Sequence, residues 1–272
     1  MVDVGQVEMQ GSTTEETAPL PQNLGQIFCG KEAYPRLPSK LNIGDKLLCG
    51  IDQLRPNNTS LLVERGGVLL QTPNNEIIII ECGKPGETFE LRAQQITDED
   101  VEEYIKSPYM LFHKDKPTND MIIVEWPVLD RNRAYFKSLM DKGMKVLMGT
   151  KLGAIHSHPS GNLPSPFDVG QALYTHHERK ESEVVVTNGW SYFLIPSLQT
   201  PDLWETDEDM EMLLTLLESD QEVWKQQESG SYAPGEGPIT TYRYKMIQDL
   251  CQEYCVGFYT LKEGEKTAQR VF

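Results

Sequence analysis

The chain has 272 residues, and 39% of them are hydrophobic, which is enough for a substantial buried core. It carries 41 acidic residues against 25 basic ones, for a net charge of -16. Such a charge repels a phosphate backbone or an anionic membrane surface, so it excludes functions whose main affinity is for nucleic acid or for membranes. Protein partners with a basic or mixed-charge surface fit better.

The N-terminal residues 1–26 are polar and acidic, with no basic and apolar segments of the kind that form a signal peptide, so we expect a disordered tail. No later apolar run approaches the length of a membrane span. The five cysteines are odd in number and lack Cys-x-x-Cys spacing, which argues against a disulfide framework and against a cysteine zinc site: Cys29, Cys49, Cys82, Cys251 and Cys255. A cytoplasmic location follows as the expectation.

Residues 27–95 are predicted to form a small β domain. Short β-prone runs alternate there with Gly, Pro and Asn clusters typical of turns, at residues 46–51, 60–64, 68–71 and 76–82. Glu64 and Glu81 lie on these predicted strands without a His or Asp nearby in the sequence. The domain is therefore interpreted as a scaffold in preference to a substrate-docking module.

Residues 96–200 alternate helical and β-prone patterns and are predicted to form an α/β domain. The order is a helix, an antiparallel hairpin, a helix, a strand, a helix and two strands, at residues 97–106, 109–113 with 121–128, 131–142, 145–155, 166–180, 183–186 and 190–195. Residues 201–272 are predicted to be a mostly helical C-terminal extension, with helices at 206–227 and 240–255 and a strand at 256–261. Nothing in this extension carries recognisable chemistry, and its apolar positions are interpreted as core packing.

The most informative stretch follows the strand predicted at 145–155. Side chains two apart on a strand share a face, so His156 and His158 point the same way. A Pro- and Gly-rich loop follows, and Ser165-Pro166-Phe167-Asp168 has the pattern of a helix start. The loop can return Asp168 to the imidazoles. Two imidazoles and one carboxylate make a three-ligand zinc set with a fourth position open for water, as in catalytic zinc sites.

This combination of His-x-His-Pro, a Gly/Pro loop and Ser-x-x-Asp resembles the JAMM metalloprotease family, also called MPN+ or JAB, over residues from about 97 to 198. The loop is about one residue shorter than in many members. The resemblance implies an α/β sandwich, bound Zn²⁺ and hydrolysis of peptide or isopeptide bonds at the C-terminus of a ubiquitin-like protein. It also implies that Ser165 hydrogen-bonds the oxyanion of the tetrahedral intermediate, although the hydroxyl could instead only cap the helix.

The family also uses an upstream glutamate as general base, and here the sequence departs from the usual pattern. At the start of the first predicted strand stands Lys106-Ser107-Pro108, without a carboxylate. If the hairpin turns at residues 116 and 117, Pro108 lies opposite Glu125, an acid within an apolar run. Glu125 is the predicted general base, with the alternatives Glu102 and Glu103. The remaining histidines are predicted to be structural or on the surface: His113, His176 and His177.

Two other interpretations remain open at this point. His-Pro-Ser-Gly also resembles the RadC branch, which suggests a DNA-associated protein, but the acidity argues against tight DNA binding. The missing glutamate suggests a catalytically silent MPN-type interaction module, whereas the complete ligand set argues for an enzyme. The flanking segments could bind a further protein partner.

Overall fold

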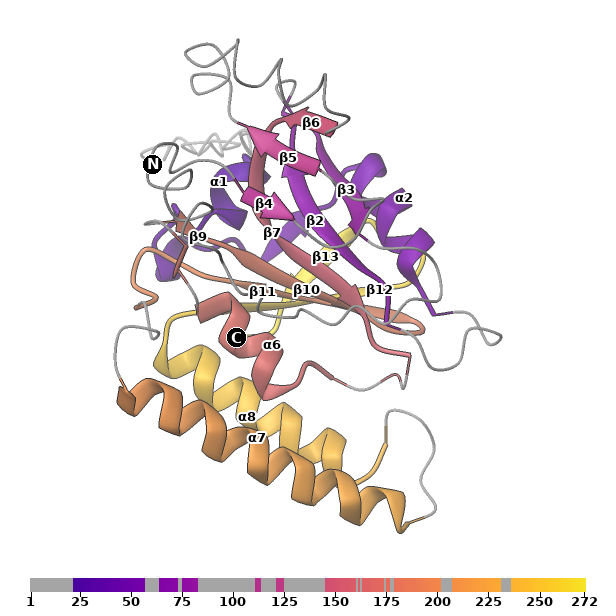
Figure 1. The fold of residues 1–272 in the computed structure, drawn as a ribbon, viewed down its shortest axis with the longest axis vertical. Helices are drawn as coiled ribbons and strands as arrows, with labels where there is room; N and C mark the ends of the chain where they lie inside the picture. Colours follow the sequence, from indigo (N-terminus) through magenta and orange to yellow (C-terminus); the bar gives the residue numbers. More distant parts are fainter. Residues whose placement is uncertain are drawn as a thin grey trace, which may run out of the picture.

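The computed structural model describes residues 22–56, 64–72, 75–82, 111–113, 121–124, 145–159, 161, 163–173, 175–176, 179–201, 207–230 and 236–272. These residues form a mixed α/β fold around a curled eight-stranded sheet (Figure 1). The strand order is β1-β13-β12-β11-β10-β7-β2-β3. Their bounds are β1 Lys40–Asn42, β2 Gly66–Gln71, β3 Ile77–Cys82, β7 Thr150–Ser157, β10 Ser182–Val186, β11 Trp190–Ile195, β12 Gly257–Lys262 and β13 Thr267–Arg270.

Smaller elements complete the described fold. One three-stranded sheet has the order β4-β5-β6, from Leu111–His113, Met121–Val124 and Lys145–Met148, and a two-stranded ribbon pairs β8 Thr175–His176 with β9 Arg179–Lys180. A short 3-10 helix covers Tyr34–Arg36. The α-helices are α1 Leu24–Phe28, α2 Asp45–Leu54, α6 Pro166–Leu173, α7 Asp207–Glu228 and α8 Pro238–Glu253. No described helix combines the length and the apolar character needed to cross a bilayer.

Helices cover both faces of the large sheet. Successive residues of its strands point to opposite sides, so that neighbouring side chains pack against different helices. Val184 and Val186 of β10 belong to a core cluster shared with α1 and α2, whereas Val185 belongs to a second cluster with α6 and α8. In Figure 1, α6 lies between the sheet and the side-by-side pair α7 and α8. Since His156 pairs with Val185 across the parallel β7–β10 ladder, it faces the α6–α8 side.

The unit β7-α6-β10 carries the candidate ligands and sets how their strand and helix are arranged. β7 and β10 are parallel, which requires a crossover, and α6 lies on that crossover. All five residues of β10 are buried, as expected for a strand covered on both faces. At Gly153 of β7 the backbone has φ 155°, and a Cβ there would lie 1.8 Å from the Ser182 carbonyl oxygen of β10. Only glycine lets these two strands approach so closely.

Several predicted elements are confirmed. The hairpin β4–β5 is antiparallel, with Leu111 opposite Ile123. The helices α7 and α8 and the strand β12 occupy the predicted ranges at 206–227, 240–255 and 256–261 to within three residues at each end. The coarse α/β class is therefore confirmed. The predicted helices at 97–106 and 131–142 and residues 1–21 of the predicted tail 1–26 lie outside the described residues. The domain boundaries at 1–26, 27–95, 96–200 and 201–272 stay predictions.

Three local predictions are wrong. Residues 46–51, predicted as a strand, belong to helix α2, because Leu47, Ile51 and Leu54 recur at helical spacing and are buried on one face. The run 145–155 is interrupted at Gly149, so that β6 and β7 lie in different sheets. Helix α6 ends at Leu173 rather than near residue 180, and β8 and β9 follow.

The strands expected in a separate small β domain, β2 and β3, lie in the large sheet. β2 pairs directly with the histidine-bearing strand β7, with Gly66 opposite His156. Residues from the first third of the chain therefore border the candidate site.

We expect Gly153→Ala to lower the free energy of unfolding by roughly 2–4 kcal/mol, because the new methyl group must displace the backbone of β10 or strain that of β7. Denaturant unfolding followed by circular dichroism measures this. The control is Gly44→Ala, at a position where a Cβ meets nothing within 4 Å; its effect should stay within about 1 kcal/mol. Equal stability of the two variants would show that β7 and β10 tolerate a wider separation.

Candidate metal centre

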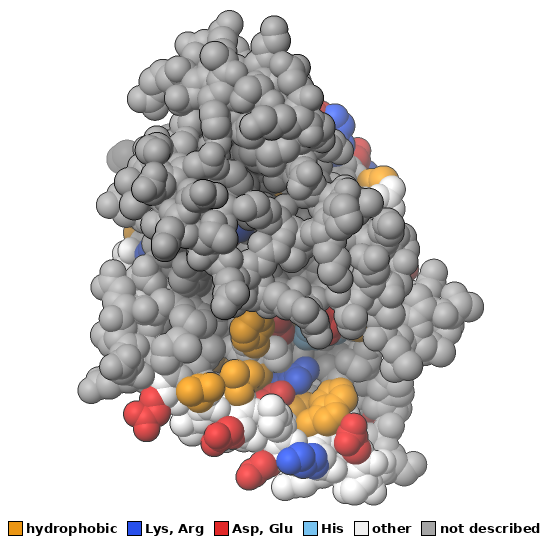
Figure 2. Space-filling model, in the orientation of Figure 1, with side chains coloured by type: hydrophobic (Ala, Val, Ile, Leu, Met, Phe, Trp, Pro, Cys, Tyr) orange, Lys and Arg blue, Asp and Glu red, His pale blue; other side chains and the backbone are white. Residues whose placement is uncertain are grey.

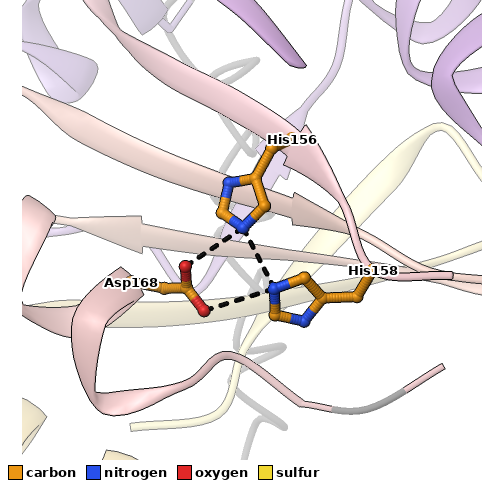
Figure 3. A group of neighbouring side chains, drawn as sticks. All are labelled: His156, His158 and Asp168. Carbon is orange, nitrogen blue, oxygen red and sulfur yellow. Dashed lines mark hydrogen bonds and ion pairs between the residues drawn. The ribbon is translucent and has the colours of Figure 1, made fainter. Parts of the chain in front are cut away.

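Three predicted ligands converge at the end of β7. The Nε2 atoms of His156 and His158 lie 3.0 Å apart, and they approach Asp168 Oδ1 and Oδ2 at 3.0 and 3.4 Å (Figure 3). Ligand atoms in a tetrahedral zinc site, each about 2.0–2.1 Å from the ion, lie about 3.3 Å from one another. The two imidazole nitrogens and the carboxylate therefore fit a zinc ion in both chemistry and spacing.

Asp168 is held by the start of its own helix. The backbone N–H of Ser165 donates to Asp168 Oδ2 at 2.5 Å, and the Ser165 hydroxyl donates to the same oxygen at 2.7 Å. In return the N–H of Asp168 approaches the Ser165 hydroxyl oxygen at 3.4 Å, so that the two residues cap the helix reciprocally. Burial opposes ionisation, but the charges of His156 and His158 and these hydrogen bonds keep the pKa of Asp168 well below its usual range. The carboxylate is thus ionised and oriented.

His156 is oriented by a second carboxylate, which sequence reasoning did not identify. Glu183 lies on β10, only 3% of its surface is exposed, and its Oε1 lies 2.8 Å from His156 Nδ1. A hydrogen bond donated by Nδ1 leaves the lone pair on Nε2, the nitrogen that faces His158 and Asp168. The signal was an acid inside the apolar run Ser182-Glu183-Val184-Val185-Val186, where an acid needs a partner.

The pKa values of the two histidines are shifted in opposite directions. Burial disfavours the charged form of His156, but the charge of Asp168 and the hydrogen bonds to Asp168 and Glu183 raise its pKa well above the usual value. For His158, burial together with the positive charges of His156 and Arg243 lowers the pKa, against the attraction of Asp168 and Glu64. Burial raises the pKa of Glu183, while the hydrogen bond with His156 opposes that rise.

Glu64 brings a further carboxylate to the site. Its Oε1 lies 3.9 Å from His158 Nε2, and half of its side chain is exposed. The position is fixed by the neighbouring backbone: the Arg65 N–H donates to the Ser157 hydroxyl at 2.9 Å, and the Ser157 N–H donates to the Arg65 carbonyl at 2.7 Å. The start of β2 is therefore bonded to the residue between the two histidines.

Glu64 has no His or Asp nearby in the sequence, but the fold brings it next to His158, which follows β7. Glu64 lies at the end of the run predicted as a strand at 60–64, two residues before β2, and outside residues 97–198, which carry the JAMM resemblance. Glu125, Glu102, Glu103 and His177 lie outside the described residues, and the side chains of His113 and His176 are likewise not described. In the described part of the chain, His156, His158 and Asp168 are the group that could hold a metal.

The surface around the site is mixed in character. Figure 2 shows histidine surface next to acidic side chains, above the region where α7 and α8 lie, and further apolar and acidic side chains over those helices.

Comparisons with models of protein families, with curated proteins and with solved structures find no match. The likeness to the JAMM family accordingly stays a prediction.

We expect one zinc ion per chain in protein purified without chelators, because the three ligand atoms already lie at the spacing of a tetrahedral site. Elemental analysis measures it. His156→Ala and Asp168→Ala should lose the ion, whereas Glu181→Gln, at a residue that precedes β10 and pairs with Lys151 at 2.6 Å, should keep it. Unchanged metal content in the two ligand variants would contradict the site.

The raised pKa of His156 predicts how metal affinity depends on pH. Below that pKa an incoming ion must displace a proton from Nε2, so the apparent metal affinity should rise about tenfold per pH unit. Because the pKa is raised, the affinity should level off only above the ordinary pKa of histidine, about 6.5. Chelator competition from about pH 6 to about pH 8.5 tests this. Glu183→Gln removes one cause of the shift, so its affinity should level off at lower pH. If the affinity of the wild type and of Glu183→Gln levels off at the same pH, Glu183 does not raise the pKa of His156.

Proposed function

We propose that this protein is a zinc-dependent hydrolase of peptide or isopeptide bonds, of the JAMM type. The observation that supports it best is the convergence of His156, His158 and Asp168 with a half-exposed carboxylate, Glu64, beside them. Three protein ligands with a free approach for water are typical of catalytic rather than structural zinc. Glu64 adds a carboxylate beside this position. A hydrolase needs such a group as a general base, and a structural zinc site does not.

Zinc bound by these ligands would supply a positive charge that lowers the pKa of a water molecule to about 7 and polarises a carbonyl group. Glu64 is placed to take the proton of that water and to pass it to the leaving amine. Its half-exposed side chain, 3.9 Å from His158, can move between these positions. We therefore propose Glu64 as the general base, in place of Glu125.

Ser165 can serve the oxyanion in spite of its bond to Asp168. Asp168 Oδ2 accepts both the hydroxyl and the backbone N–H of Ser165. If the hydroxyl rotates toward a developing negative charge, the N–H still holds the carboxylate oxygen in place. The capping role and the proposed catalytic role are thus compatible. Both the N–H and the hydroxyl of Ser165 bond Asp168, so the N–H alone can keep the cap while the hydroxyl serves the oxyanion.

The proposed substrate is a ubiquitin-like modifier with an extended, Gly-rich C-terminal tail. This part of the proposal rests on the JAMM resemblance and on charge. A net charge of -16 attracts a basic partner face and speeds the encounter at low salt, while it disfavours nucleic acid as a ligand. The same charge favours this function over a RadC-like role on DNA.

Glu64→Gln should retain zinc and lose turnover by at least about a hundredfold, because the amide keeps the shape of the side chain but does not accept the proton. The assay follows cleavage of ubiquitin-like fusions by the zinc-loaded enzyme, with a generic unfolded protein as the comparison substrate. Glu76→Gln, at a surface ion pair with Lys46, is the matched control and should cleave normally.

Three results would redirect this proposal. Normal cleavage by Glu64→Gln together with loss in Glu125→Gln would return the role of base to Glu125. Efficient digestion of the unfolded protein would remove the modifier-specific substrate while leaving the hydrolase in place. Zinc binding without cleavage of any substrate in a broad panel would favour the silent interaction module.

A further inference from the structure

A buried cation of the C-terminal helix pair contacts the loop that connects His158 to Asp168. Arg243 of α8 is 8% exposed, and its Nη1 donates to the carbonyl of Leu163 at 3.0 Å. Leu163 lies two residues before Ser165, and its side chain is buried against α6 and α8. A residue 80 positions further along the chain thus holds the backbone of the loop.

The same guanidinium is fixed on its other side. Its Nε and Nη2 donate to Asp220 Oδ1 and Oδ2 of α7 at 2.9 and 2.8 Å, and the group lies 5.6 Å from the ring centroid of Trp224. A bidentate bond to a buried carboxylate sets the plane of an arginine, so the directions of the Nη1 N–H groups are set as well. One of these N–H groups is aimed at the loop.

The loop has few hydrogen-bond donors of its own, because three of its residues are prolines without an N–H, Pro159, Pro164 and Pro166. A buried carbonyl such as that of Leu163 needs a donor from elsewhere. Since Ser165 orients Asp168 through its own backbone N–H, a shift of the preceding backbone would move this N–H and the metal-ligating carboxylate together.

We propose that Arg243 is a positioning residue of the metal centre, which ties helices α7 and α8 to the loop and thereby keeps Ser165 and Asp168 in ligating geometry. This inference rests on the proposed metal-dependent function. It assigns to the C-terminal helix pair a role in the site, beyond the core packing expected from its apolar positions.

Two variants separate this role from general folding. Arg243→Lys keeps the charge, but one ammonium does not reproduce the planar fork that spans Asp220 and Leu163. The double variant Asp220→Leu with Arg243→Met removes both buried charges at similar volume, a change that often preserves stability. The control is Lys245→Met on the same helix, whose partner Asp249 is exposed.

The readout is Zn²⁺ affinity by chelator competition, measured well below the melting temperature of each protein, together with the absorption spectrum of the Co²⁺ form. Both Arg243 variants should bind Zn²⁺ about 10- to 100-fold more weakly and show an altered Co²⁺ spectrum, whereas Lys245→Met should match the wild type. Wild-type affinity and spectrum in the double variant would overturn the proposal, also where Arg243→Lys fails to fold. If the wild type itself binds no metal, the proposed function falls first, and the positioning role falls with it.

Discussion

The buried carboxylate of Asp168 is the group on which the arrangement of the site depends. It lies buried in the first turn of α6, where an ionised acid requires positive charge and hydrogen-bond donors close by. Ser165 supplies the donors, and the imidazole of His156, whose pKa is raised, supplies positive charge beside it. A divalent cation would satisfy the same carboxylate without requiring an imidazolium, which is why protons and metal compete for this site.

The three ligands could be predicted from the sequence because each signal is local. Alternation along a strand places His156 and His158 on one face, and the Ser-x-x-Asp pattern places Asp168 at a helix start. Glu64 and Glu183 could not be found in this way. Glu64, two residues before β2, approaches His158, and Glu183 on β10 approaches His156, because β2 and β10 are the neighbours of β7 in the sheet. Which strands become neighbours depends on packing over the whole sheet, and no short window of sequence records it.

The fold shows the same division. Helices α7 and α8 were predicted well because long segments with apolar residues at helical spacing are a strong local signal. Residues 46–51 of α2 have the composition of a strand, with β-prone residues such as Ile51. The spacing of Leu47, Ile51 and Leu54 decides the outcome once that face packs on the sheet. The membership of β2 in the large sheet again depends on pairing between segments more than 70 residues apart.

The C-terminal helices contribute to the environment of the site as well as to the core. His156 stands on the face of the sheet that α6 and α8 cover, and Ile247 and Leu250 of α8 pack there with Val169 and Leu173 of α6. Without α8 this face would expose both the apolar cluster and the loop before Asp168. The low dielectric that strengthens the attraction between Asp168 and the histidines therefore depends on residues from the end of the chain, and so does the donor that satisfies the loop. The candidate site, built from a contiguous motif of thirteen residues, thus acquires its electrostatic properties from segments far away in the chain, β2 on one side and α8 on the other.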